Sequence, residues 1–174
     1  MEIKIYTPFE PATLTEKNKI ADFLFEHLDQ YGDKREDILR ALEYALKETA
    51  SHGGYIVTGF RKEKIVGAVV INQTGMKGYI PENILVYIAV DGGRRGEGIG
   101  KKLMKKAIAL ANGDIALHVE PDNPARNLYE KLGFTNKYLE MRLKNPAPAT
   151  VPVLDKSRKP DTSEATDGVN RKSE

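Results

Sequence analysis

An apolar segment followed by a glycine-rich one constrains this chain more than any other feature. Residues 84–90, Ile-Leu-Val-Tyr-Ile-Ala-Val, have the length and the β-branched content typical of a strand buried on both faces. Five glycines follow within the ten residues 91–100, so the backbone there can adopt positive φ angles and approach another group closely. Apolar residues then recur at helical spacing from Ile99 to Ala111, with lysines between them. The sequence therefore predicts a strand, a tight loop and an amphipathic helix.

A helix that begins in such a loop presents unpaired N–H groups and the positive end of its dipole, a combination that favours phosphate binding. Two common phosphate motifs are excluded. A Walker loop would need Gly at the position of Arg95 and Ser or Thr after Lys101. The dinucleotide fingerprint would need a third Gly where Lys101 or Leu103 stands. The pattern that remains is Arg95-x-x-Gly98-x-Gly100.

A second block, residues 123–134, reads Asn-Pro-Ala-Arg-Asn-Leu-Tyr-Glu-Lys-Leu-Gly-Phe. Together with Arg95-x-x-Gly98-x-Gly100 it resembles the two signatures of the GCN5-related N-acetyltransferases (GNAT), in the family's order and with a predicted strand between them. In one respect the chain departs from the commonest pattern, which has Asn seven residues before the tyrosine. Asp122 holds that place here, and Asn123 follows it.

The resemblance implies that acetyl-CoA binds where two parallel strands splay apart, with its pantetheine arm along the backbone of Ile88, Ala89 and Val90. It implies further cofactor contacts at Asn123 and Arg126. The pyrophosphate would lie on the N–H groups of the loop, where Arg95 adds a charge-assisted hydrogen bond. The loop residues concerned are Arg95, Gly96, Glu97, Gly98, Ile99, Gly100 and Lys101.

The catalytic groups follow less directly from the sequence. The resemblance assigns to Tyr129 the protonation of the departing thiolate, and a phenol with a pKa of about 10 keeps its proton at neutral pH. Tyr129 would otherwise be a core residue of an amphipathic helix. Many family members carry a general-base Glu where this chain has Ile84, which cannot accept a proton. Two other residues are candidates for the general base: Glu82, on the same face of the strand, and His118, on the next strand.

The remaining pattern predicts a mixed α/β fold. It has a sheet of six or seven strands, antiparallel at its start and parallel around a central pair, and about four helices. The resemblance implies that the central pair is splayed. Residues 55–60 and 65–71 are separated by a short charged turn, which forces an antiparallel hairpin. The other predicted strands are residues 2–6, 115–119 and 138–143; the other predicted helices are 15–31, capped by Thr13 or Thr15, 33–50, and one that starts after Asn123.

We expect one domain over residues 1–144 and a disordered tail over 145–174, where Pro, Ser, Thr and charged residues replace aromatic ones. A net charge of +2 does not indicate a nucleic-acid partner. No apolar run is long enough for a membrane span, the N-terminus has no signal-peptide pattern, and the chain has no Cys. We therefore expect a cytoplasmic protein that binds neither membranes nor metal ions.

The function predicted is transfer of an acetyl group from acetyl-CoA to a primary amine of a small molecule or a protein. The transfer would occur by direct attack in a ternary complex, since without Cys no thiol acyl-enzyme can form. The competing interpretation is a non-catalytic acyl-CoA-binding or regulatory domain, suggested by Ile84. For the oligomeric state, the sequence leaves both a monomer and a homodimer as alternatives.

Overall fold

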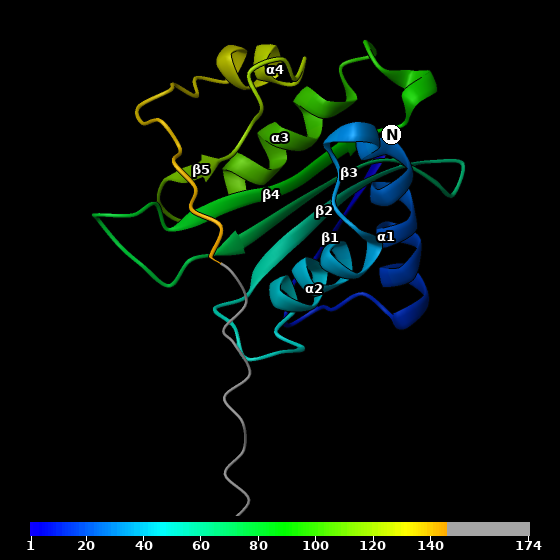
Figure 1. Ribbon diagram of the computed structural model, residues 1–174. Coiled ribbons are helices and arrows are strands. Elements are labelled where there is room, and N and C mark those ends of the chain that lie inside the picture. Colours follow the sequence, from blue (N-terminus) through cyan, green and yellow to red (C-terminus); the bar gives the residue numbers. More distant parts are fainter. Residues whose placement is uncertain (146–174) are drawn as a thin grey trace, which may run out of the picture. The chain divides into compact units, whose positions relative to one another are not determined.

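The computed structural model describes residues 1–145, and all of its helices and strands lie in a compact unit, Met1–Glu140. The elements follow the chain in a mixed α/β order (Figure 1). They are β1 (Glu2–Tyr6), α1 (Leu14–Leu28), the 3-10 turn η1 (Asp29–Tyr31), α2 (Arg35–Ala45), β2 (Gly54–Arg61), β3 (Lys64–Gln73), β4 (Asn83–Val90), the 3-10 turn η2 (Gly92–Arg94), α3 (Ile99–Leu110), β5 (Ile115–Leu117) and α4 (Arg126–Lys131).

One mixed sheet organises the unit, with the strands in the order β1-β2-β3-β4-β5. The first four strands pair antiparallel, and β4 and β5 pair parallel through the crossover helix α3. The predicted fold class is therefore confirmed, including the hairpin of β2 and β3 and a parallel pair between the predicted strands, formed by residues 83–85 and 115–117. The parallel pair lies at one edge of the described sheet, where the sequence suggested its centre. The number of strands is not as predicted: the described residues contain five, where the sequence suggested six or seven.

The missing strand is the predicted one at residues 138–143, which forms neither helix nor strand. Its apolar side chains Tyr138, Leu139, Met141 and Leu143 are all largely exposed. Alternation of apolar and polar residues reports which face of a strand would be buried, but it does not supply an edge to pair with. The only edge at that end of the described sheet is β5, which is three residues long.

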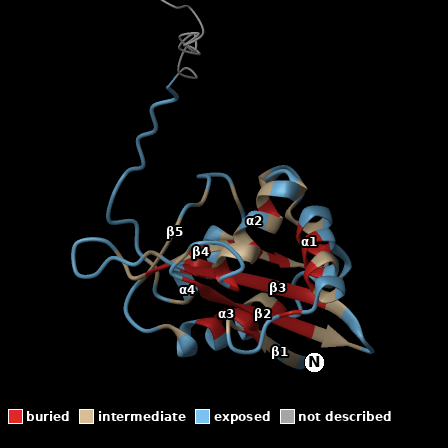
Figure 2. Ribbon diagram, turned by 90° about the horizontal axis from the view of Figure 1, so that it is seen from below, coloured by how far each residue is buried: buried red, intermediate tan, exposed pale blue. Residues whose placement is uncertain are grey.

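Two apolar layers cover the two faces of the sheet, and the buried residues drawn red in Figure 2 run along the strands between them. On one face α1 and α2 pack over the sheet around Ile20, Leu24 and Leu42. On the other, α3 packs with Leu103 and Met104 against Val57 and Val69. The strands that carry the predicted site are thus held from both sides.

The start of α1 is fixed by a capping box. Thr13 Oγ1 accepts from Glu16 N (3.2 Å), and Glu16 Oε2 accepts from Thr13 N (2.9 Å). Of the two caps predicted, Thr13 is the one used. Glu16 Oε1 also accepts from Lys4 Nζ (2.6 Å), which joins the helix to β1.

The strand β4 has two different edges. Toward β3 it is paired along its whole length, from Gln73 with Asn83 to Gly67 with Val90, and a bulge leaves Val86 without a partner. Toward β5 it is paired only at its first three residues, Asn83 to Leu85. The second half of β4 therefore has an open edge, as the predicted splay requires.

Candidate active site

The loop between β4 and α3 forms an open helix N-terminus. Gly98, the N-cap of α3, has φ 77°, and Gly96 has φ 87°, both in the left-handed region that favours glycine. A Cβ atom at either position would meet no protein atom within 4 Å. None of the described side chains caps the helix, so the N–H groups of its first turn have no capping partner within residues 1–145. This geometry fits an anion such as a pyrophosphate.

Neighbouring elements hold the loop in place. Arg95 donates from Nη2 to the carbonyl oxygen of His27 (3.1 Å), at the end of α1, and Gly92 N donates to His27 Nδ1 (3.4 Å). Arg61, at the end of β2, pairs with Glu97 (2.5 Å). The ion pair offsets the negative charge of Glu97, which would otherwise oppose an anion.

The first turn of α3 also contacts α4. A Cβ atom at Gly100 would lie 3.3 Å from Leu128 Cδ2 and 3.4 Å from Val90 Cγ2. Any side chain larger than Gly there must displace both neighbours by a few tenths of an ångström. The close approach brings α4 over the end of β4, beside the loop.

Tyr129 projects from α4 into the apolar layer that includes Ile99, and it is 7% exposed. Its ring packs edge-on against Phe134, with the centroids 5.9 Å apart. Its hydroxyl makes no hydrogen bond to any of residues 1–145. Burial raises the pKa of Tyr129 to about 12, so the phenol is protonated at neutral pH. The position suits both a proton donor and a core residue.

The two candidate bases are in different surroundings. Glu82 precedes β4 at the closed end of the strand pair, where its Oε2 accepts from Asp114 N (2.9 Å). That hydrogen bond lowers the pKa of Glu82, so its carboxylate is a weaker base. His118 is exposed and comes directly after β5, at the point where the two strands separate.

The two polar residues predicted near the cofactor make local contacts. Asn123 Oδ1 accepts from Ala125 N (2.9 Å), which starts the turn into α4. Arg126 pairs with Glu130 one turn along the same helix (2.9 Å). By contrast, Ile88, Ala89 and Val90 lie on the half of β4 whose edge toward β5 is open.

One contact beside the splay was not anticipated from the sequence. Tyr87, on β4, donates from its hydroxyl to Asp33 Oδ2 (2.7 Å), in the turn between η1 and α2. A tyrosine within the apolar run of residues 84–90 was the only available signal, and it did not identify a partner so distant in the chain.

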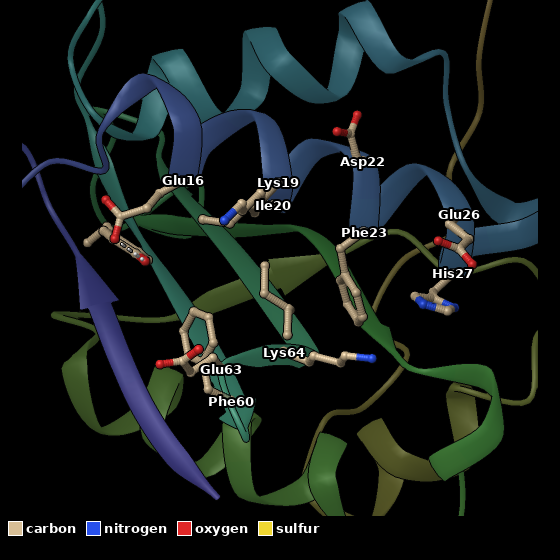
Figure 3. A pocket seen from close by; sticks show the side chains of 12 residues that line it. Glu16, Lys19, Ile20, Asp22, Phe23, Glu26, His27, Phe60, Glu63 and Lys64 are labelled. Carbon is tan, nitrogen blue, oxygen red and sulfur yellow. Dashed lines mark hydrogen bonds between the residues drawn. The ribbon is translucent and has the colours of Figure 1, made fainter.

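A cavity of about 590 Å³ lies between α1 and the hairpin of β2 and β3 (Figure 3). Its lining combines apolar side chains with charged side chains of both signs (Figure 3). The lining residues are Tyr6, Glu16, Lys19, Ile20, Asp22, Phe23, Glu26, His27, Phe60, Glu63, Lys64 and Ile65. None of the predicted catalytic or cofactor-binding residues lines it, but His27 joins it to the glycine loop.

No group of three or more His, Cys, Asp or Glu side chains in residues 1–145 is arranged to hold a metal ion. None of the helices there has both the length and the apolar character needed to cross a membrane.

Comparison with known families decides the relationship. The model of the acetyltransferase (GNAT) family matches residues 18–134, which include both sequence motifs and the glycine loop. The chain belongs to the GNAT family. Its members are acetyltransferases that use acetyl-CoA. No curated protein sequence matches the chain.

Solved structures agree with this GNAT fold. PH1933 from Pyrococcus horikoshii OT3 is 26% identical, with a TM-score of 0.59 over 80% of this chain and 93% of that one. The ribosomal-protein-alanine N-acetyltransferase from Brucella melitensis biovar Abortus 2308 is 16% identical, with a TM-score of 0.58 over 84% and 99%. AAC(6')-Iy, in complex with the bisubstrate analog CoA-S-monomethyl-acetylneamine, is 15% identical, with a TM-score of 0.61 over 84% and 99%.

Proposed function

We propose that this GNAT protein transfers an acetyl group from acetyl-CoA to a primary amine by direct attack in a ternary complex. The observation that carries the proposal is the continuity of two features, the open edge of β4 and the uncapped N-terminus of α3 that follows it. The first can accept an extended amide chain as an added strand, and the second can accept a pyrophosphate. Pantetheine and pyrophosphate are joined in CoA in that order.

The residues of the loop would hold the pyrophosphate through the N–H groups of Arg95 to Lys101. The guanidinium of Arg95 adds a positive charge, and it can reach the anion if it leaves the His27 carbonyl. On the open edge, backbone groups of Ile88, Ala89 and Val90 would bind the pantetheine amides. Bound acetyl-CoA supplies a thioester, the group that an amine can attack. An N–H of Ala89 or Val90 would then stabilise the negative charge that develops on the carbonyl oxygen.

Two proton transfers complete the proposed chemistry. Tyr129 gives the proton of its hydroxyl to the departing sulfur, and its partly apolar surroundings keep that proton in place until then. A base takes a proton from the amine. We favour His118 for this step over Glu82, because His118 is exposed at the mouth of the splay, whereas Glu82 is engaged with Asp114 N.

One observation favours a second function. Ile84 stands where many family members have a glutamate, so the chain could bind acyl-CoA without catalysing transfer. A binding or regulatory domain of this kind would use the same loop and the same strand edge. It would differ from the enzyme only in turnover.

Thiol release from acetyl-CoA with a panel of primary amines separates the two functions. We expect turnover with at least one amine and CoA binding that calorimetry can measure. Tight CoA binding without thiol release for any amine would support the binding domain. Absence of CoA binding would contradict both functions.

A further inference from the structure

The cavity between α1 and the hairpin of β2 and β3 is separate from the residues proposed to bind CoA. Its volume of about 590 Å³ is within the range of small-molecule sites in proteins. None of the residues proposed to contact CoA lines it. In the sheet, Ile65 of the cavity lies two residues before Gly67, which pairs with Val90 at the end of β4. The cavity therefore lies beyond the end of the strand proposed to bind pantetheine.

Apolar surface is available to a ligand inside this cavity. Phe23 of α1 and two hairpin residues, Phe60 and Ile65, line it, and both hairpin residues are only half-buried. In the part of the chain that the structure describes, Phe60 belongs to neither apolar layer. A half-buried aromatic ring outside the core favours a ligand with an apolar group that can cover it.

Four charged side chains at the cavity make no hydrogen bond or ion pair with any of residues 1–145. They extend from both walls (Figure 3) and are Lys19 and Glu26 of α1 and Glu63 and Lys64 of the hairpin. The other two carboxylates of the lining are paired, Glu16 with Lys4 and Asp22 with Arg35. Two ammonium groups and two carboxylates are thus available to a ligand that carries charges of both signs.

The turn of the hairpin is strained. Arg61 pairs with Lys64, so Lys62 and Glu63 form a two-residue turn, and their φ angles are 48° and 63°. Such turns favour Asn and Gly, because other residues are strained at positive φ. Glu63 nevertheless occupies the turn and lines the cavity. Glycine would relieve the strain, but it would remove the carboxylate from the cavity.

Both walls of the cavity also contact the glycine loop. The ring of Phe23 packs against that of His27, with the centroids 4.5 Å apart, and His27 accepts hydrogen bonds from two loop residues. On the hairpin, Arg61 precedes the strained turn and pairs with Glu97 of the loop. A ligand that joins the two walls would therefore stabilise the contacts that hold the loop in place.

We propose that the cavity binds a zwitterionic α-amino acid with a large apolar side chain, and that this ligand strengthens CoA binding at the loop. The apolar side chain packs against Phe23, Phe60 and Ile65. The lysines of the two walls bind the ligand's carboxylate, and the glutamates bind its ammonium group. The effect on CoA rests on the proposed function, whereas the amino-acid site itself does not.

A series of ligands that each lack one group tests the site. L-Phenylalanine carries all three groups, 2-phenylethylamine lacks the carboxylate, 3-phenylpropionate lacks the ammonium group, and glycine lacks the side chain. In calorimetry with the CoA-free protein, we expect saturable binding of L-phenylalanine. The other three should bind at least tenfold more weakly, the scale of one charge-assisted hydrogen bond. Equal affinity for L-phenylalanine and any of the three, or no binding of L-phenylalanine, would overturn the site.

Variants of the turn show whether the cavity is where the ligand binds. Lys64→Met should weaken L-phenylalanine binding by about tenfold. Lys62→Met is the matched control, because Lys62 is in the same turn but does not line the cavity, and it should bind as the unmodified protein does. Glu63→Gly should raise the melting temperature and still weaken binding, which separates loss of the carboxylate from loss of the fold. Equal losses in the two methionine variants would overturn the site.

Calorimetry of CoA with and without saturating L-phenylalanine tests the effect on the loop. We expect the affinity for CoA to rise about fivefold, the lower end of coupling between two sites, and Lys64→Met to remove the rise. Unchanged affinity would overturn the effect, and competition would show that CoA itself occupies the cavity. If CoA does not bind at all, the proposed function fails, while the ligand series with the CoA-free protein still decides the amino-acid site.

Discussion

Removal of the hydroxyl oxygen of Tyr129 distinguishes a catalytic role of this residue from a packing role. Its hydroxyl makes no hydrogen bond to residues 1–145, so Tyr129→Phe should cost little stability. If the hydroxyl protonates the sulfur, turnover at saturating acetyl-CoA should fall by about 10²-fold or more. Thiol-release kinetics and thermal melting measure the two effects separately.

Tyr55 supplies the matched control for this experiment. It is in the same apolar layer, and burial raises its pKa to about 12 as well, but its hydroxyl donates to the Ala107 carbonyl (2.7 Å). Tyr55→Phe should therefore lower stability by about 1 kcal/mol and leave turnover unchanged. Full turnover in the Tyr129 variant, with chemistry shown to limit the rate, would remove Tyr129 from the mechanism.

Glu16 should make stability depend on pH. Its hydrogen bond from Lys4, and those from Thr13, lower the pKa of Glu16 from 4.5 to about 2. A carboxylate with a lowered pKa stabilises the fold above its unfolded pKa, and this contribution is lost as the pH falls toward the folded value. Glu16→Gln should thus reduce the free energy of unfolding at pH 7, by about 1 kcal/mol given its partial exposure.

The difference in the free energy of unfolding between the unmodified protein and the Glu16→Gln variant should then shrink as the pH falls from about 4.5 to about 2. Urea unfolding at several pH values measures it. Glu10→Gln, a change at an exposed glutamate near the same helix start, should show no such convergence. A constant difference across the pH range would mean that Glu16 is not held in its charged form by these partners.

At the scale of elements, the loop before α3 depends on Gly98 for its backbone conformation. Valine at φ 77° is strained by about 1–2 kcal/mol, and its side chain would occupy the open space proposed for the pyrophosphate. We expect Gly98→Val to weaken CoA binding by about tenfold or more, measured by calorimetry.

Gly92 provides the comparison, since its φ is not in the left-handed region and a Cβ there would also meet open space. Gly92→Val should bind CoA much as the unmodified protein does. Equal affinities of the two valine variants would show that the loop does not form the pyrophosphate site.

The elements were predictable wherever local chemistry decides them. Thr13 caps α1, and the apolar period locates α3, because capping and amphipathicity act within a few residues. The end of α2 was not predictable. The helix ends at Ala45 instead of residue 50, because Lys47 takes φ 57° and Glu48 turns toward the buried Lys17 of α1. Lys and Glu are good helix formers, so only the tertiary contact could have revealed the stop.

The same distinction applies to the site. The glycine loop is visible in the sequence because positive φ angles need glycine. The hydrogen-bond partners of Arg95 and Tyr87 are not visible in the sequence, because they lie at the end of α1 and in the turn after it, far away in the chain. No residue pattern in either segment marks the other as its neighbour.

For the whole molecule, we expect residues 1–144 to form the complete domain. Of the residues that the structure describes after Phe134, none belongs to either apolar layer. A protein ending at Lys144 should melt within about 3 °C of the full chain, as a change below 1 kcal/mol would allow. It should also bind CoA with the same affinity. A larger fall in the melting temperature, measured by circular dichroism, would place residues after 144 within the folded unit.

The strand order of the sheet has a consequence for how the proposed cofactor site can be inherited. The strands lie side by side in chain order, so β4, the loop, α3, β5 and α4 come from one uninterrupted segment, residues 83–131. The proposed cofactor site is thus encoded in one continuous stretch of sequence. The segments α1 and α2, which cover the opposite face of the sheet, can therefore diverge while every residue proposed to contact the cofactor is inherited as one block.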